Sequence, residues 1–123
     1  MTVRGIGIDV ADLERFRVLY ARHGDRFAGK WFTDVERERC LRTRDPGGAL
    51  AEHFAVKEAV WKALGPSEWA APLPWRSIVY VAESDTACLD DVAAARADGL
   101  DVHVSVARHG AVAIATALVT VRS

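Results

Sequence analysis

Cysteine and proline are scarce in this sequence, and no long apolar run occurs. Cys40 and Cys88 are too few and too far apart for a disulfide framework or a zinc site, so we expect two reduced thiols. The longest apolar run, residues 111–119, is far too short to cross a membrane. A formal net charge of −1 gives no reason to expect binding to nucleic acid or to membrane surfaces. The first residues also lack the apolar core of a signal peptide, so we expect a cytoplasmic protein.

Apolar and charged residues occur in ordinary proportions, 50% and 27% of the 123 residues. These proportions are typical of a globular protein, and the length suffices for one hydrophobic core but not for two. We therefore predict a single domain spanning residues 1–123. Basic residues are concentrated between Arg15 and Arg44, which indicates either a local basic face or an ordinary solvated face of mixed charge.

The N-terminal segment, residues 3–10, alternates as a β-strand does. Ile6, Ile8 and Val10 share one face, which we expect to be buried in a sheet. The opposite face carries two glycines and then Asp9. Glycine in a strand often marks the close approach of a ligand or of another backbone, so this face contacts a ligand, a packed helix or both.

Amphipathic and capping patterns predict the other elements. The predicted helices are 11 to about 23, 33–41 behind a Thr33–Glu36 capping box, 49 to about 64, and one starting at Ser84 or Asp85 and reaching about 97. The predicted strands are 77–82, 102–107 and 111–121, with an irregular connection at 66–74. Segregated helices and a terminal hairpin favour an α+β fold rather than a doubly wound parallel sheet.

The helix after residue 49 is the most informative segment. Leu50, Phe54, Trp61 and Leu64 form an apolar stripe, and Glu58 and Lys62 lie together on its flank, four residues apart. Such a pair is either an ordinary surface ion pair or part of a site. Together with Asp9, Glu58 would suit a Mg²⁺ ion, which takes oxygen ligands and usually only one or two carboxylates. A lysine one turn further on would neutralise phosphate charge beside that ion.

Four segments of the sequence resemble the holo-acyl-carrier-protein synthase family, the small AcpS-type 4′-phosphopantetheinyl transferases. Residues 5–10 (GIGIDV) are similar to its opening motif, and residues 32–36 (FTDVE) to its F-T-x-x-E segment. Residues 50–65 (LAEHFAVKEAVWKALG) closely match its L-A-x-R-F-A-x-K-E-A-x-x-K-A-L-G signature. Residues 102–105 (VHVS) resemble the start of its final hairpin.

The resemblance implies a trimeric α+β protein in which a small antiparallel sheet packs against the long helix. It also implies transfer of the phosphopantetheine arm of coenzyme A to a serine of an acyl carrier protein, with release of 3′,5′-ADP. In that activity Asp9 and Glu58 would bind Mg²⁺ and Lys62 would stabilise the leaving group. A metal-bound water or one of the carboxylates would take the serine proton.

Further roles follow from the same resemblance. The residues that would contact coenzyme A, in addition to Lys62, are His53, Lys57, Arg44 and Ser105. Lys57 falls within the apolar stripe, so it either snorkels structurally or reaches the site. Arg15, with Arg22 and Arg26, would dock the acidic helix of the carrier protein.

The sequence departs from the family at the expected nucleotide end of the site. His53 replaces an arginine and cannot make a bidentate phosphate contact; it is either a ligand contact or a helix-surface histidine. Arg108 occupies the usual histidine position of the final hairpin, and the turn after Gly65 is altered. Two alternatives therefore stay open: a non-catalytic trimeric module that binds carrier protein or coenzyme A, and a metal-dependent phosphodiester hydrolase. The sequence does not distinguish fatty acid from polyketide synthesis.

Overall fold

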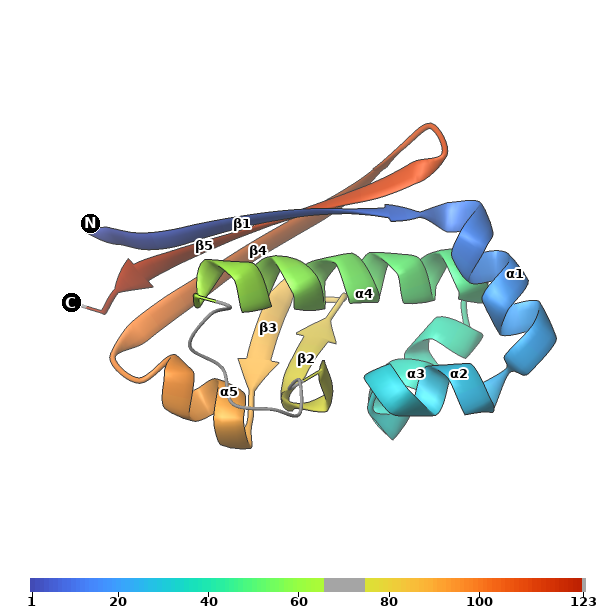
Figure 1. The fold of residues 1–123 in the computed structure, drawn as a ribbon, viewed down its shortest axis with the longest axis horizontal. Helices are drawn as coiled ribbons and strands as arrows, with labels where there is room; N and C mark the ends of the chain where they lie inside the picture. The colour runs from blue at the N-terminus through green and yellow to red at the C-terminus, as the bar shows by residue number, and fades with distance from the viewer. Residues whose placement is uncertain (66–74, 123) are drawn as a thin grey trace.

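The structure, a computed structural model, describes residues 1–65 and 75–122 (Figure 1). The irregular connection predicted at residues 66–74 lies outside these described residues. The elements, in chain order, are β1 (Val3–Asp12), α1 (Leu13–His23), α2 (Asp25–Trp31), α3 (Asp34–Leu41), α4 (Pro46–Ala63), η2 (Trp75–Ser77), β2 (Ile78–Val81), β3 (Thr86–Leu89), α5 (Asp91–Arg96), β4 (Leu100–His109) and β5 (Val112–Val121).

The described strands form two antiparallel sheets, one of order β1-β5-β4 and a hairpin of β2 with β3. In Figure 1 helix α4 runs between the three-stranded sheet on one side and the β2–β3 hairpin on the other. Helices α1, α2 and α3 gather at one end of α4, and the two chain termini lie at the other end. The α+β prediction, with a small antiparallel sheet packed against a long helix, is confirmed. None of the helices described is long and apolar enough to span a bilayer.

Strand β1 contacts the backbone of α4 through its glycines. A Cβ atom on Gly5 would lie 2.0 Å from the Ala63 carbonyl oxygen, and one on Gly7 would lie 1.9 Å from that of Ala59. Both distances are far below any real carbon–oxygen contact, so only glycine allows the strand to pack here. Of the two interpretations of these glycines, close packing of a helix is confirmed.

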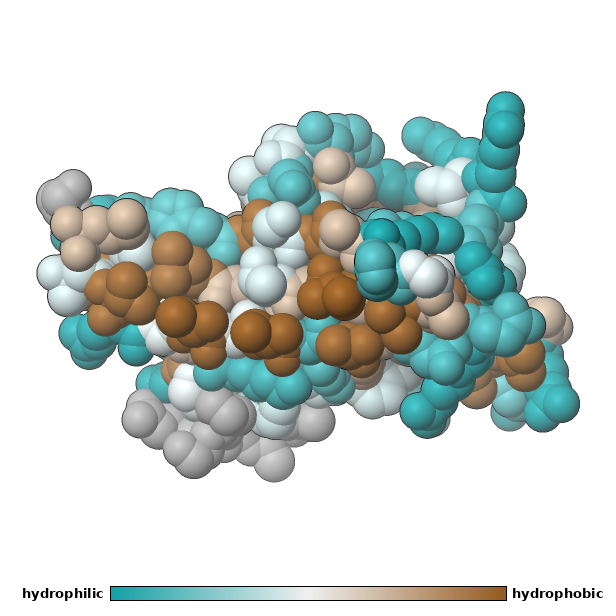
Figure 2. All heavy atoms as spheres, turned by 90° about the horizontal axis from the view of Figure 1, so that it is seen from above, coloured by the Kyte–Doolittle hydropathy of each residue, from teal (hydrophilic) through white to brown (hydrophobic). Residues whose placement is uncertain are grey.

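The prediction that Ile6, Ile8 and Val10 are buried is wrong. Their side chains are 64%, 58% and 56% exposed, because α4 covers only the glycine face of the sheet. Strand periodicity shows which residues share a face but not which face is covered. Figure 2 shows the resulting band of apolar side chains, which we call the outer apolar face and define as Val3, Ile6, Ile8, Val10 and Ile114.

Helix α4 is buried around most of its circumference. The small side chains of Ala51, Ala55 and Ala59 are fully buried, which allows close packing on more than one side. The helix begins at Pro46, three residues before the predicted start, because the Asp45 carboxylate accepts a hydrogen bond from the Gly48 amide at 3.2 Å. Pro46 in the first turn loses no intrahelical hydrogen bond.

A buried ion pair connects α3 to α4. The Lys57 ammonium donates to Glu36 Oε1 at 2.7 Å, to the Trp75 carbonyl oxygen at 2.8 Å and to that of Ile78. Glu36 also closes the predicted capping box, which is confirmed, and its Oε2 accepts from the Tyr80 amide at 3.0 Å. Three acceptors satisfy the three ammonium protons, which makes this burial tolerable.

Two elements differ from the sequence prediction. Helix α2 was not predicted, and residues 86–89 form strand β3 where a helix was expected. Asp85, at φ 54°, makes the turn that pairs β3 with β2, and the helix that follows is the short α5. Both errors fall on elements of seven residues or fewer, where packing against neighbours outweighs local propensity.

The glycine contact gives a stability prediction. In Gly7→Ala the new methyl group meets the Ala59 carbonyl and must push β1 away from α4, so we expect a loss of about 2 to 3 kcal/mol in the free energy of unfolding. Gly29→Ala is the matched control, because its Cβ would meet nothing closer than 3.9 Å. Urea denaturation followed by circular dichroism measures both; equal stability of the two variants would contradict the packing argument.

Candidate functional site

Strand β1 and helix α4 bring Asp9, Glu58 and Lys62 together. The Lys62 ammonium lies 3.0 Å from Asp9 Oδ1 and 3.2 Å from the Ile8 carbonyl oxygen. Asp9 follows Gly7 on the same face of β1 and is almost completely buried, whereas Lys62 is partly open to solvent. The structure thus places Lys62 beside Asp9, and the metal and phosphate roles of Asp9, Glu58 and Lys62 stay predictions.

The two carboxylates interact directly. Burial, a hydrogen bond with Asp9 and the negative charge of Asp9 together raise the pKa of Glu58 to about 7, while the nearby Lys62 charge opposes this shift. Two carboxyl groups that share a site cannot both ionise without a neighbouring cation. The pair therefore has the electrostatics of a cation-binding site in which Lys62 supplies part of the positive charge.

The donor set fits magnesium better than zinc. Among the described residues, no three His, Cys, Asp or Glu side chains come together as a metal cage. Mg²⁺ is usually held by one or two carboxylates and completes its octahedron with waters and phosphate oxygens. Asp9 and Glu58 match that requirement, and the Lys62 side chain beside Asp9 is 41% exposed to solvent.

An aromatic groove of about 300 Å³ adjoins Glu58. Its lining is Phe16, Leu19, Phe27, Trp31 and Phe54, with Arg15 and Glu58 at its borders. The rings contact one another, with the Phe16 and Phe54 centroids 5.3 Å apart and those of Trp31 and Phe54 5.4 Å apart. Sequence reasoning missed Phe27 and Trp31, although their spacing of four residues was a usable signal for one helical face.

A basic groove of about 460 Å³ shares residues with the aromatic groove. It adds His23, Arg26 and Lys30 to Arg15 and to the aromatic wall. Of the three arginines predicted to dock a partner, Arg15 and Arg26 line this basic groove, whereas Arg22 is exposed and does not. Lys30 was not predicted and adds to the positive charge there.

The structure corrects one predicted ligand contact, Lys57, and rules out one of the two interpretations of His53. Lys57 is 0% exposed and all its donors are used within the core, so it anchors the fold and does not reach a ligand. His53 is 4% exposed, which excludes the helix-surface alternative, and its Nδ1 lies 2.9 Å from the Ala49 carbonyl oxygen. Arg44 and Ser105 are exposed and lie apart from the three-residue cluster in sequence and element.

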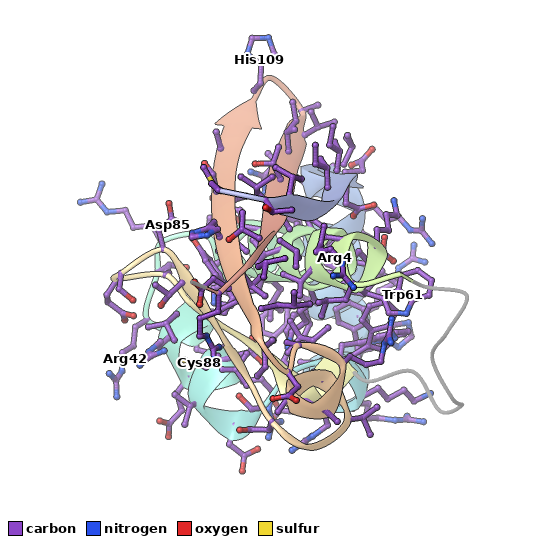
Figure 3. The ribbon with its side chains drawn as sticks, turned by 90° about the vertical axis from the view of Figure 1, so that its left-hand side faces the viewer. Arg4, Arg42, Trp61, Asp85, Cys88 and His109 are labelled. Carbon is purple, nitrogen blue, oxygen red and sulfur yellow. The ribbon has the colours of Figure 1, made fainter. Side chains whose placement is uncertain are left out.

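Arg108 forms ion pairs with two carboxylates of the protein itself. It donates to Asp45 Oδ2 at 2.7 Å and to Glu52 Oε1 at 2.9 Å, so it ties β4 to the start of α4. Arg17 of α1 also pairs with Asp45, and its hydrogen bond holds the pKa of that carboxyl well below its usual range. The next residue, His109, points away from the body of the molecule at the tip of the β4–β5 hairpin (Figure 3).

Comparisons with known proteins show which family the chain resembles. A model of the 4′-phosphopantetheinyl transferase superfamily matches residues 5–114. The holo-[acyl-carrier-protein] synthase of Chlorobaculum tepidum is 39% identical over 111 residues, 89% of this chain and 94% of the relative.

Solved structures show the same fold. The holo-[acyl-carrier-protein] synthase from Neisseria meningitidis has a TM-score of 0.80 at 25% identity, covering 96% of this chain and 98% of its own. The holo-[acyl-carrier-protein] synthase from Helicobacter pylori, solved in complex with coenzyme A, has a TM-score of 0.76 at 22% identity. The match covers 94% of this chain and 99% of that synthase.

The matched region contains the strand with Asp9 and the helix with Glu58 and Lys62. Both the family match and the relative cover most of the chain, and the fold agrees with that of the solved synthases. The chain therefore belongs to the 4′-phosphopantetheinyl transferase superfamily, in the family of the holo-[acyl-carrier-protein] synthases.

Proposed function

We propose that this protein transfers the 4′-phosphopantetheine arm of coenzyme A to a serine of an apo acyl carrier protein, with Mg²⁺ as cofactor and 3′,5′-ADP as the second product. The observation that supports this most is the cluster of Asp9, Glu58 and Lys62 beside the aromatic groove, in a chain of this superfamily. A module that only bound its partners would have no use for all three charged groups together.

Asp9, Glu58 and Lys62 would have different roles in the transfer reaction. Asp9 and Glu58 would hold Mg²⁺, which neutralises charge on the pyrophosphate of coenzyme A when it is bound. The serine Oγ forms a bond to the phosphorus that carries the pantetheine arm, and the bond from that phosphorus to the oxygen of 3′,5′-ADP breaks. Lys62 Nζ, which pairs with Asp9 at 3.0 Å, donates to the leaving phosphate as its charge grows. The serine proton goes to a carboxylate oxygen of the pair or to a water beside it.

The basic groove would receive the carrier protein. Arg15, His23, Arg26 and Lys30 give this surface a positive charge that complements an acidic helix, and it continues into the aromatic groove that ends at Glu58. Charge complementarity of this kind mainly accelerates encounter and fixes orientation. Arg22, exposed on the same helix, would act at longer range.

The outer apolar face would be the subunit interface of a homotrimer. Ile6, Ile8 and Val10 are more than half exposed, and contiguous apolar surface of this kind marks an interaction site. Strand β1 presents this face on one side and Asp9 on the other. Assembly would therefore bury the back of the strand that carries a metal ligand.

The activity has a direct test by intact mass. With coenzyme A, Mg²⁺ and an apo carrier protein from the same organism, we expect a mass gain of one phosphopantetheine arm. Asp9→Asn, Glu58→Gln and Lys62→Met should each reduce the rate at least about 100-fold, since each removes stabilisation of developing charge. Glu38→Gln, an exposed carboxylate of α3, is the control and should keep full activity. No mass gain with any carrier of that organism would overturn the proposal and favour the non-catalytic alternative.

The raised pKa of Glu58 predicts a pH dependence of stability. In metal-free protein, folded Glu58 has a pKa of about 7 and keeps its proton up to that pH, whereas the unfolded side chain loses it near the ordinary glutamate pKa of 4.5. The unfolded state binds fewer protons between these values, so stability should fall as pH rises through this window. Mg²⁺ should restore stability above about pH 7, because it binds the ionised pair.

Calorimetry in EDTA and in Mg²⁺, from about pH 5 to about pH 8, measures this effect. Glu58→Gln should flatten the metal-free profile and remove the Mg²⁺ response, whereas Glu38→Gln should change neither. A Glu58→Gln profile as steep as that of the wild type would show that another group titrates.

The proposed interface can be tested by introducing a charged side chain into the outer apolar face. Ile8→Glu places a carboxylate in the outer apolar face and should convert a trimer into monomers, measured by sedimentation at micromolar concentration. Val35→Glu, on the exposed surface of α3 and outside this face, should leave the trimer intact. A wild-type protein that sediments as a monomer, or an Ile8→Glu variant that stays trimeric, would contradict the assignment.

A further inference from the structure

The Asp45 carboxylate joins three elements at the start of α4. Its Oδ1 accepts from the Gly48 amide at 3.2 Å and from Arg17 Nε of α1 at 3.1 Å. Its Oδ2 accepts from Arg17 Nη2 and from Arg108 Nη1 of β4, each at 2.7 Å. We call Arg17, Asp45 and Arg108 the Asp45 cluster. It connects α1 to both α4 and β4, and its three residues have no part in the proposed transfer chemistry.

Two glycines make room for the Asp45 cluster. A Cβ atom on Gly47 would lie 2.5 Å from the Cα of Arg17, and one on Gly48 would lie 2.1 Å from Asp45 Oδ2. Both distances are far below van der Waals contact, so a larger residue would push α1 or the carboxylate away. The start of α4, which lies beside α1 in Figure 1, therefore contacts α1 at backbone distance as well as through charge.

The bond between Arg17 and Asp45 fixes how α1 is turned about its own axis. A guanidinium that binds one carboxylate through two nitrogens is held in a single orientation. Residues two apart on a helix point in nearly opposite directions, so an Arg17 held against α4 directs Arg15 away from it. Arg15 and Leu19, four residues apart on one face of α1, line the basic groove. The rotation of α1 thus determines where the basic groove faces relative to Glu58.

Removal of the Asp45 charge should leave the fold intact. Arg108 would keep its ion pair with Glu52 at 2.9 Å, and Arg17 would keep its ion pair with Glu14 at 3.5 Å. Asparagine is also a favoured residue before the first turn of a helix, so Asp45→Asn should preserve the start of α4. This substitution therefore releases α1 from α4 without leaving either arginine unpaired.

We propose that Asp45 is a positioning residue for the carrier protein: through Arg17 it holds α1 in the rotation that presents the basic groove to an acidic carrier helix. The inference rests on carrier modification being the proposed function. Positioning and simple attraction predict opposite effects of Asp45→Asn. The variant makes this end of the protein more positive, so attraction alone would tighten carrier binding. Loss of the α1 orientation would weaken it, because a small misplacement of a docked substrate is costly.

Titration calorimetry with an apo carrier protein, and KM values for carrier and coenzyme A in the transfer assay, test this role. Asp45→Asn should raise the Kd and KM of the carrier about tenfold and leave the KM of coenzyme A within about twofold. Gly47→Ala disturbs the same contact without a change in charge, so it should also weaken carrier binding, and it decides the question if Asp45→Asn does not fold. Arg122→Met removes an arginine that pairs with Asp101 at 3.2 Å, at the end of the molecule away from α1, and should change neither value.

Hydrogen exchange gives a readout that does not depend on the carrier. The amides of α1 should exchange faster in Asp45→Asn, whereas those of the buried part of α4 should not change. Unchanged exchange in α1, or carrier binding by Asp45→Asn at least as tight as that of the wild type, would overturn the inference even if transfer occurs. Equal losses for carrier and coenzyme A would overturn it as well, because they indicate a general structural defect. Weaker carrier binding by Asp45→Asn in a protein that transfers nothing would overturn the proposed function and leave the positioning role standing.

Discussion

The backbone of β1 passes directly against the carbonyl groups of α4 because Gly5 and Gly7 have no Cβ atoms. This contact sets the distance between the strand and the helix. Because the two elements are so close, Asp9 of β1 contacts Glu58 and Lys62 of α4. Any side chain at either glycine would separate the elements that supply the two carboxylates. The site therefore depends on Gly5 and Gly7, which have no side-chain functional groups.

A second constraint operates on the opposite side of α4. Lys57 and Glu36 bury opposite charges and use them to hold α3, α4 and β2 together through hydrogen bonds to backbone groups. The helix is thus fixed by close backbone packing on one side and by a fully satisfied ion pair on the other. A rigid helix is what a metal and phosphate site needs, since its ligands must be held in position before the substrate arrives.

Local patterns in the sequence predicted the long helix, the Thr33 capping box, the terminal hairpin and the grouping of Asp9, Glu58 and Lys62. They did not predict which face of β1 is covered, because alternation is the same for either face. The burial of Lys57 and His53 was not predicted, because it depends on α3 and β2, which are distant in sequence. Helix α2 and strand β3 were missed because each is short and depends on packing for its stability.

The two faces of strand β1 differ in the amino-acid substitutions that they can accept during evolution. Residues alternate along it between a face that packs on α4 and ends in Asp9 and a face that is open and apolar. Odd-numbered positions from Gly5 to Asp9 tolerate almost nothing, while even-numbered positions from Ile6 to Val10 admit any apolar side chain as far as the fold is concerned. New assembly partners can therefore evolve along this strand without disturbing the chemistry on its other side.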